Sequence, residues 1–133
     1  MSYKQIHTEF LTAIKKDLEA CDVKGNINTP RWGGRHIYVD RDLEADLYVR
    51  FKKNDDYTIA YVIASIHLPD HLCGHGLLPK LIEAIKLHAP NEISELHFEC
   101  VTNARLVVNL VKRGFKQLDS NCNLSLHLGN TLL

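Results

Sequence analysis

A glycine-rich hexapeptide, His71-Leu72-Cys73-Gly74-His75-Gly76, separates a β-branched run, Tyr57 to Leu68, from a helix-like run, Leu77 to Ala89. This order predicts a strand, a tight turn and a helix. Such a turn presents free backbone N–H groups beside the positive end of a helix dipole. Phosphate and pyrophosphate groups bind at sites of this kind, so the turn points to a ligand that carries phosphate.

Two common phosphate-binding motifs do not fit this turn. A dinucleotide fingerprint needs a third glycine three residues after the second, and that position is Pro79. The Lys-Ser/Thr pair that ends a P-loop is also absent. Taken alone, two glycines beside a proline also suit an ordinary surface turn, so the neighbouring elements have to decide between the interpretations.

The length and composition predict one globular domain over residues 1–133, with 45% hydrophobic residues and 16 basic against 16 acidic side chains. The balanced charge favours neither nucleic acid nor an anionic membrane as a partner. Because no apolar run is long enough to span a bilayer and the N-terminus lacks a signal-peptide core, we expect a cytoplasmic protein. Four scattered cysteines without a Cys-x-x-Cys pair favour reduced thiols.

The segment before the turn predicts one helix and three strands. A helix is expected over Tyr3 to Cys21, because its apolar residues fall four apart and Ser2 with Gln5 can form a capping box. Residues 22–34 are rich in Gly and Asn and predict a loop. Strands are expected at His36 to Val39, Asp46 to Phe51 and Tyr57 to Leu68, with an antiparallel hairpin turn at Asn54-Asp55-Asp56.

The segment after the turn predicts a helix from Leu77 to Ala89, which tolerates Pro79 in its first turn. There follow a strand from Glu95 to Val101, a helix from Asn103 to Gly114, and a hairpin of Phe115 to Leu118 with Leu124 to Leu128. A strand-helix-strand unit requires a right-handed parallel crossover. We therefore predict an α/β (α+β) fold: a mixed, mostly antiparallel sheet with a central parallel strand-helix-strand crossover, flanked by helices.

These features resemble the GNAT superfamily of acyl-CoA-dependent N-acetyltransferases, over roughly Ala45 to Leu128. The family's acetyl-CoA motif is Gln/Arg-x-x-Gly-x-Gly/Ala between its fourth strand and a helix, and the hexapeptide departs from it only at His71. The family also tends to place an Asn at the start of the next helix and a Gly-Phe pair at its end. Asn103, Gly114 and Phe115 stand at that spacing. The resemblance implies acetyl-CoA as cosubstrate.

The resemblance further implies that main-chain groups hold acetyl-CoA. Amides of Leu72 to Leu77 would bind the pyrophosphate, and Ile66 to Leu68 would pair with the pantetheine arm like an added strand. Asn103 would reach the pantetheine, and an amide near a strand bulge would steady the thioester carbonyl, with Ile66 or His67 at the reacting end. The expected cofactor-binding residues are Ile66, His67, Leu68, His71, Leu72, Cys73, Gly74, His75, Gly76, Leu77 and Asn103.

The family's usual general acid is missing. Many members place a Tyr five residues before the Phe of the Gly-Phe pair, where this chain has Leu110, and the Ser of other branches is replaced by Leu106. The remaining catalytic candidates are His67, Glu99 and Cys100, of which an imidazole best suits proton transfer at neutral pH. Each also has an ordinary structural interpretation, as a solvent-facing strand residue, a surface charge and a small buried side chain. Water can also protonate the CoA thiolate.

A zinc site is the alternative for this region. His67, His71 and His75 are four apart with Cys73 among them, and on one helix they would share a face. Pro69 and the two glycines break a helix there, so we predict no metal.

Two functions remain open. The first is an N-acetyltransferase that moves acetyl from acetyl-CoA to a small-molecule or protein amine by direct attack. The second is a catalytically reduced GNAT-like module that binds CoA or a protein partner without turnover, and this alternative includes an origin in a phage or mobile element. Leu110 favours the second function, whereas the glycine turn with Asn103 favours at least cofactor binding. The sequence identifies no acceptor, and it leaves open a homodimer through the sheet or the terminal strand.

Overall fold

A computed structural model describes residues 2–20, 34–53, 58–99, 104–118 and 123–128. The elements are α1 (Tyr3–Ala20), β1 (Gly34–Asp40), β2 (Ala45–Lys53), β3 (Ile59–His67), a 3-10 helix η2 (Asp70–Leu72), α3 (Leu77–His88), β4 (Ile93–Phe98), α4 (Ala104–Lys112), β5 (Lys116–Gln117) and β6 (Leu124–His127). The predicted order of helices and strands is confirmed, and η2 is an addition to it. Gly34 begins β1 instead of ending a loop, and β4 begins at Ile93 instead of Glu95. The predicted turn at 54–56 and the rest of the loop at 22–34 lie outside the described residues.

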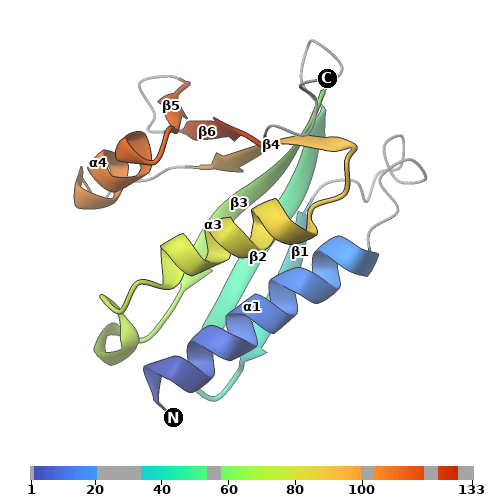
Figure 1. Cartoon of the computed structure of the whole chain (residues 1–133). Coiled ribbons are helices and arrows are strands. Elements are labelled where there is room, and N and C mark those ends of the chain that lie inside the picture. The colour runs from blue at the N-terminus through green and yellow to red at the C-terminus, as the bar shows by residue number, and fades with distance from the viewer. Residues whose placement is uncertain (1, 21–33, 54–57, 100–103, 119–122, 129–133) are drawn as a thin grey trace.

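The strands form one sheet in the order β1-β2-β3-β4-β6-β5 (Figure 1). β3 and β4 pair in parallel with α3 between them in sequence, and the other neighbouring pairs are antiparallel. The predicted mixed, mostly antiparallel sheet with a central parallel crossover is therefore confirmed. The crossover places the end of β3, the glycine turn and the start of α3 at one end of the sheet.

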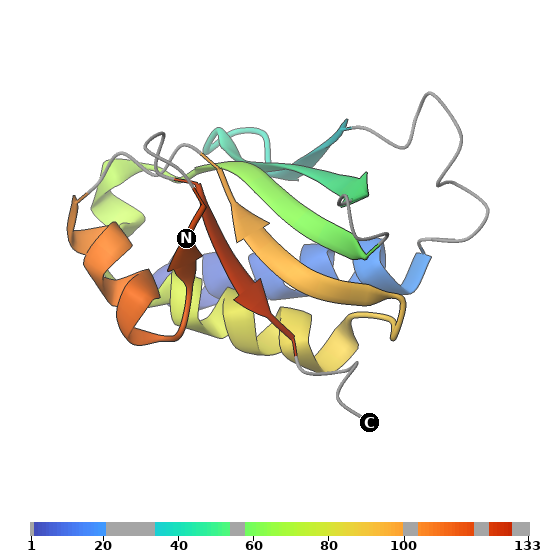
Figure 2. The same ribbon diagram turned by 90° about the horizontal axis from the view of Figure 1, so that it is seen from above.

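Helices α1 and α3 lie side by side on one face of the sheet (Figures 1 and 2). The predicted capping box of α1 is confirmed: Ser2 N–H donates to Oε1 of Gln5 (3.0 Å), and Gln5 N–H donates to Oγ of Ser2 (3.3 Å). Each buried aliphatic or aromatic side chain on these helices contributes about 1.5–3 kcal/mol to folding. No helix in the described part of the chain combines the length and the apolar character needed to cross a membrane. The buried apolar residues on the two helices are Ile6, Phe10, Ile14, Leu18, Leu77, Leu81, Ile82 and Ile85.

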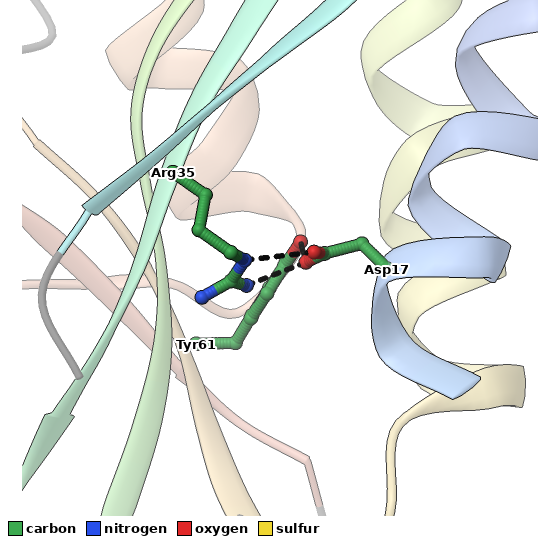
Figure 3. Close-up of polar contacts among 3 residues, drawn as sticks. All are labelled: Asp17, Arg35 and Tyr61. Atoms are coloured by element: carbon green, nitrogen blue, oxygen red, sulfur yellow. Dashed lines mark hydrogen bonds and ion pairs between the residues drawn. The ribbon is translucent and has the colours of Figure 1, made fainter. Parts of the chain in front are cut away.

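Asp17 of α1 points toward the sheet and connects the helix to two of its strands (Figure 3). Arg35 of β1 donates from Nε to Oδ1 of Asp17 (2.8 Å) and from Nη2 to Oδ2 (2.6 Å). The hydroxyl of Tyr61, a fully buried residue of β3, donates to Oδ2 of the same carboxylate (2.7 Å). The guanidinium of Arg35 also lies over the ring of Phe51, 4.8 Å from its centroid. These contacts fix α1 against two strands at once.

The opposite face of the sheet, here called the outer face, is polar along β2. Leu47, Val49 and Phe51 are buried on the helix side, and the alternate residues Asp46, Tyr48 and Arg50 point the other way. Tyr38 of β1 and Tyr48 are 50% and 39% exposed. The outer face of β1 and β2 is therefore open to solvent.

Strand β3 carries a β-bulge at Ala64. Tyr48 of β2 lies opposite Ser65, and the next residue, Val49, lies opposite Ile63, so Ala64 has no partner on β2. After the bulge, Ile66 packs against the core, whereas His67, opposite Asp46, is on the outer face. The bulge thus decides which side chains at the end of β3 face outward.

A Schellman motif ends α4. Phe115 N–H donates to the carbonyl of Leu110 and Gly114 N–H to that of Val111, each over 3.0 Å. Gly114 has a φ of 99°, in the left-handed region that favours glycine. Leu110 and Phe115 are buried, and the rings of Phe115 and Phe98 lie 5.5 Å apart between centroids. The Gly-Phe pair therefore serves as a helix stop and a core contact.

Candidate functional site

The parallel strands separate toward their C-terminal ends. Described pairing between β3 and β4 ends at Ile63 opposite Phe98, and Glu99 N–H still donates to the carbonyl of Ile63 (3.2 Å). β3 continues to His67, paired there with β2, whereas β4 turns away toward α4 (Figure 1). Within the part of the chain that the structure describes, the other edge of Ile66 and His67 pairs with no strand. An extended ligand can hydrogen-bond to such an edge.

The glycine turn lies between β3 and α3. Leu72 is buried, and η2 uses two of the amides that were expected to face a phosphate: Leu72 N–H donates to the carbonyl of Pro69 (2.9 Å), and Cys73 N–H to that of Asp70 (3.1 Å). Gly74 and Gly76 have φ values of 79° and 78°. A Cβ at either glycine would meet no atom within 4 Å, so the space in front of the turn is open.

The free amides begin after this 3-10 turn. In the described residues, the N–H groups of Gly74, His75 and Gly76 donate to no backbone carbonyl. Those of Leu77 and Leu78 lie in the first turn of α3, where helix geometry offers no acceptor. Together with the helix dipole, this row fits an anion of phosphate or pyrophosphate size.

Residues at the start of α1 pack against the glycine turn. The ring of Tyr3 stacks on His75 with centroids 4.1 Å apart, and its edge contacts His7 at 5.4 Å. Nδ1 of the buried His7 lies 3.0 Å from Nζ of Lys80, and Nε2 of His7 has no hydrogen-bond partner among the described residues. Burial, followed by the charges of Lys80 and His75, lowers the pKa of His7, so a neutral imidazole accepts the hydrogen bond of Lys80.

On the outer face, the carboxylate of Asp46 lies between two histidines. Its Oδ1 is 2.6 Å from Nδ1 of His67 on β3, and its Oδ2 is 3.0 Å from Nε2 of His36 on β1. Burial raises the pKa of Asp46, but the hydrogen bonds and charges of His67 and His36 outweigh it and hold that pKa below its usual value. Sequence reasoning identified His67 and missed its two neighbours, which only strand register brings to it.

A hollow of about 750 Å³ adjoins His67. Its lining includes Ile66 and Leu68, next to His67 on the chain, and Arg41 and Glu44 from the turn between β1 and β2. The guanidinium of Arg41 lies 4.2 Å from the ring centroid of Tyr38, which also lines the hollow. Glu44 adopts a φ of 55°, a left-handed conformation that a non-glycine residue seldom takes outside constrained sites.

The other predicted site residues fall in different places. Glu99 is held by a two-pronged ion pair with Arg50 of β2, in which Nη1 of Arg50 donates to Oε1 of Glu99 over 2.7 Å. His71 and Cys73 are exposed. Cys100 and Asn103 lie outside the described residues. Within the described chain, no group of three or more His, Cys, Asp or Glu residues is arranged to hold a metal ion.

Comparison with known proteins gives a partial structural likeness. No family model matches the chain, and no curated protein matches it in sequence. A structure of Arabidopsis thaliana Naa50 in complex with the bisubstrate analogue CoA-Ac-MVNAL is similar with a TM-score of 0.42 and 15% sequence identity. The match covers 62% of this chain and 64% of the Naa50 chain.

Proposed function

We propose that this chain is an acyl-CoA-dependent N-acetyltransferase that transfers an acetyl group from acetyl-CoA to an amine by direct attack. The observation that carries the proposal is the glycine turn. Gly74 and Gly76, both left-handed, leave open space in front of a row of free amides at the N-terminus of α3. The turn follows a strand, β3, whose far edge near Ile66 and His67 pairs with no other strand among the described residues, so an extended arm can pair with it.

In this proposal the pyrophosphate binds to the amides of Gly74 to Leu78, since those of Leu72 and Cys73 are used within the turn. The imidazoles of His71 and His75 add donors near the start of α3. His71 replaces the Gln or Arg of the family motif, and an imidazole keeps the donor while weakening the charge. Backbone groups of Ile66 to Leu68 pair with the pantetheine, and Asn103 remains a predicted contact to it.

Bound acetyl-CoA supplies an activated acyl group, and the chain positions the amine against it. Near the bulge at Ala64, an amide can steady the carbonyl oxygen as negative charge develops there. Leu110 is fully buried in the end of α4, so the position of the family's usual acid contributes to packing. Glu99 is paired with Arg50, which makes it a weaker candidate for proton transfer than His67.

A catalytically reduced module that binds CoA without turnover is the second candidate. The specific observation in its favour is Leu110, because no acidic or phenolic group takes its place in the described part of α4. Both candidates share the cofactor site and differ in the fate of the acetyl group.

Thermal unfolding with acetyl-CoA tests whether the glycine turn binds the cofactor, as both candidate functions require, or is an ordinary surface turn. A ligand that binds the native state at 100 times its Kd stabilises it by about 2.7 kcal/mol. We expect a dose-dependent rise in Tm with acetyl-CoA that ATP at the same concentration does not reproduce. CoA-thiol release over a panel of primary amines and peptides then tests transfer. No rise in Tm at saturating acetyl-CoA would contradict cofactor binding, and a rise without thiol release on any acceptor would favour the reduced module.

A further inference from the structure

We propose that His67 is the general base of this transfer, that Asp46 is its positioning residue, and that the acceptor amine occupies the hollow beside them. The proposal rests on the transferase function above. It goes further by assigning the base, the residue that orients it, and the place of the acceptor.

The hydrogen bond between Asp46 and His67 decides which imidazole nitrogen is free. An ionised carboxylate can only accept, so Nδ1 of His67, 2.6 Å from Oδ1 of Asp46, carries a proton and donates it. In the neutral ring Nε2 then bears the lone pair, and no described residue bonds to it. The His67 side chain is 66% exposed and lines the hollow. A neutral imidazole with an unprotonated, accessible Nε2 is the state that a general base requires.

Three adjacent strands fix this arrangement. His36 of β1 donates from Nε2 to Oδ2 of Asp46, so both carboxylate oxygens are held, and Asp46 lies directly opposite His67 in the pairing of β2 with β3. The ring of His36 itself packs against Tyr38 and Tyr48, at centroid distances of 4.3 and 6.2 Å. Groups placed on paired strands hold their geometry better than groups on loops. The other charged groups at the hollow are Arg41 and Glu44 of the β1–β2 turn.

The hollow adjoins the strand edge that we assign to the pantetheine. Ile66, His67 and Leu68 belong to both, so a base on His67 is beside the position of the thioester. The two carboxylates at the hollow, Asp46 and Glu44, outnumber its one guanidinium, Arg41, and this balance favours an ammonium over an anion. A volume of about 750 Å³ admits a small amine or the end of a peptide.

The proposed step conserves atoms and electrons. Nε2 of His67 first takes a proton from the acceptor ammonium, and the resulting neutral amine bonds to the acyl carbon. The bond between that carbon and sulfur breaks, and the CoA sulfur leaves with the electron pair. The acylated nitrogen gives its extra proton to the thiolate, and the imidazolium returns its own proton to water. Asp46 stays ionised throughout and stabilises the imidazolium as it forms.

The tautomer of His67 tests the positioning role without any turnover. Two-bond ¹H–¹⁵N spectra at a pH where the ring is neutral should show the proton on Nδ1 in the wild type. In Asp46→Asn the new amide can donate to Nδ1, so the proton should move to Nε2. Asp42→Asn removes an exposed carboxylate from the same β1–β2 turn and should leave the wild-type tautomer unchanged. A wild-type ring protonated on Nε2 would overturn the assignment.

Kinetics test the base itself, with acetyl-CoA as donor and primary amines as acceptors. His67→Gln should lower kcat by about 100-fold or more, and Asp46→Asn by a similar or smaller factor, with Asp42→Asn unchanged. Methoxyamine is weakly basic and already neutral at pH 7. His67→Gln should therefore lower kcat for methoxyamine much less than kcat for a strongly basic amine such as tyramine. Both variants should keep the Tm rise with acetyl-CoA.

The outcomes separate this inference from the function on which it rests. Wild-type turnover that His67→Gln leaves unchanged would overturn the base assignment while the transferase function stands. A loss of equal size for methoxyamine and tyramine would also overturn it, because a base is not needed for an amine that is already neutral. Wild-type protein that binds acetyl-CoA and acetylates no amine would end the transferase proposal itself.

Discussion

Two carboxylates in this molecule are each held by two partners across neighbouring elements, and they differ in what those partners can do. Asp17 and Asp46 are almost equally buried, with side chains 13% and 15% exposed. Arg35 and Tyr61 hold Asp17 beneath α1 (Figure 3), whereas His36 and His67 hold Asp46 on the outer face. Arginine stays charged and, like the tyrosine hydroxyl here, serves as a donor to the carboxylate, whereas each histidine keeps a second nitrogen.

The difference shows that burial of the carboxylate does not by itself indicate its role. At Asp17 the partners complete a buried contact between a helix and two strands. At Asp46 one partner, His67, is two-thirds exposed and lines a hollow. The first cluster therefore stabilises the fold, and the second is suited to moving a proton.

The largest expected effect on stability comes from Asp17→Asn. This change removes the carboxylate charge that accepts from both Arg35 and Tyr61 under α1, and Arg35 is one-third exposed, so we expect a loss of about 2–3 kcal/mol in the free energy of unfolding. Asp46→Asn should lose less than about 1 kcal/mol, because water reaches both of its histidines. Urea denaturation of the two variants measures this contrast. Equal losses of unfolding free energy in the two variants would contradict the distinction between a stabilising and a functional carboxylate.

The next effect concerns the hydroxyl of Tyr61. Tyr61→Phe removes the donor to Asp17 from a fully buried ring and should lower the free energy of unfolding by about 1.5 kcal/mol. Tyr48→Phe, on the exposed outer face, is the matched control and should change it by less than about 0.5 kcal/mol. Urea midpoints of both variants give the two values. A larger loss in Tyr48→Phe would show that the outer face contributes more to stability than we infer.

The third prediction extends the comparison from carboxylates to glycines. Gly76→Ala and Gly114→Ala both place a side chain at positive φ, so each should cost about 1 kcal/mol in stability. Only Gly76 lies in the proposed phosphate site, so only Gly76→Ala should also reduce the Tm rise produced by acetyl-CoA. Titration of both variants with acetyl-CoA checks this. An undiminished rise in Gly76→Ala would move the phosphate site away from the turn.

The smallest effect concerns pH and the buried His7. Because the pKa of His7 is lowered in the folded protein, the unfolded chain binds this proton more readily, and stability falls as pH drops below the usual imidazole value of about 6.5. His7→Gln keeps an acceptor for Lys80 and should flatten the decline of Tm between about pH 7 and 5. Scanning calorimetry across that range measures the slope. A slope in His7→Gln as steep as that of the wild type would assign the pH dependence to other groups.

Local sequence patterns predict much of this fold. The four-residue spacing of α1, its capping box and the parallel crossover through α3 all depend on neighbouring residues and are confirmed. The cluster around Asp46 depends instead on the register of three strands and on a bulge, and no local pattern marks either. The Gly-Phe pair was interpreted through a family resemblance, whereas the structure explains it as a Schellman helix stop. The roles of Cys100 and Asn103 stay predictions.

The bulge at Ala64 determines which side chain of β3 faces the hollow. With strict alternation after Ile63, residue 67 would face α1 and α3 and residue 66 would face outward. A deletion of Ala64 would therefore remove the bulge and leave Ile66 and His67 on their present faces, whereas a regular pairing that kept every residue would place an aliphatic chain at the hollow and turn the histidine toward the helices. The side chain that faces the hollow thus depends on how β3 pairs with β2, because the same residues in a strand without the bulge would present an aliphatic chain in place of the imidazole.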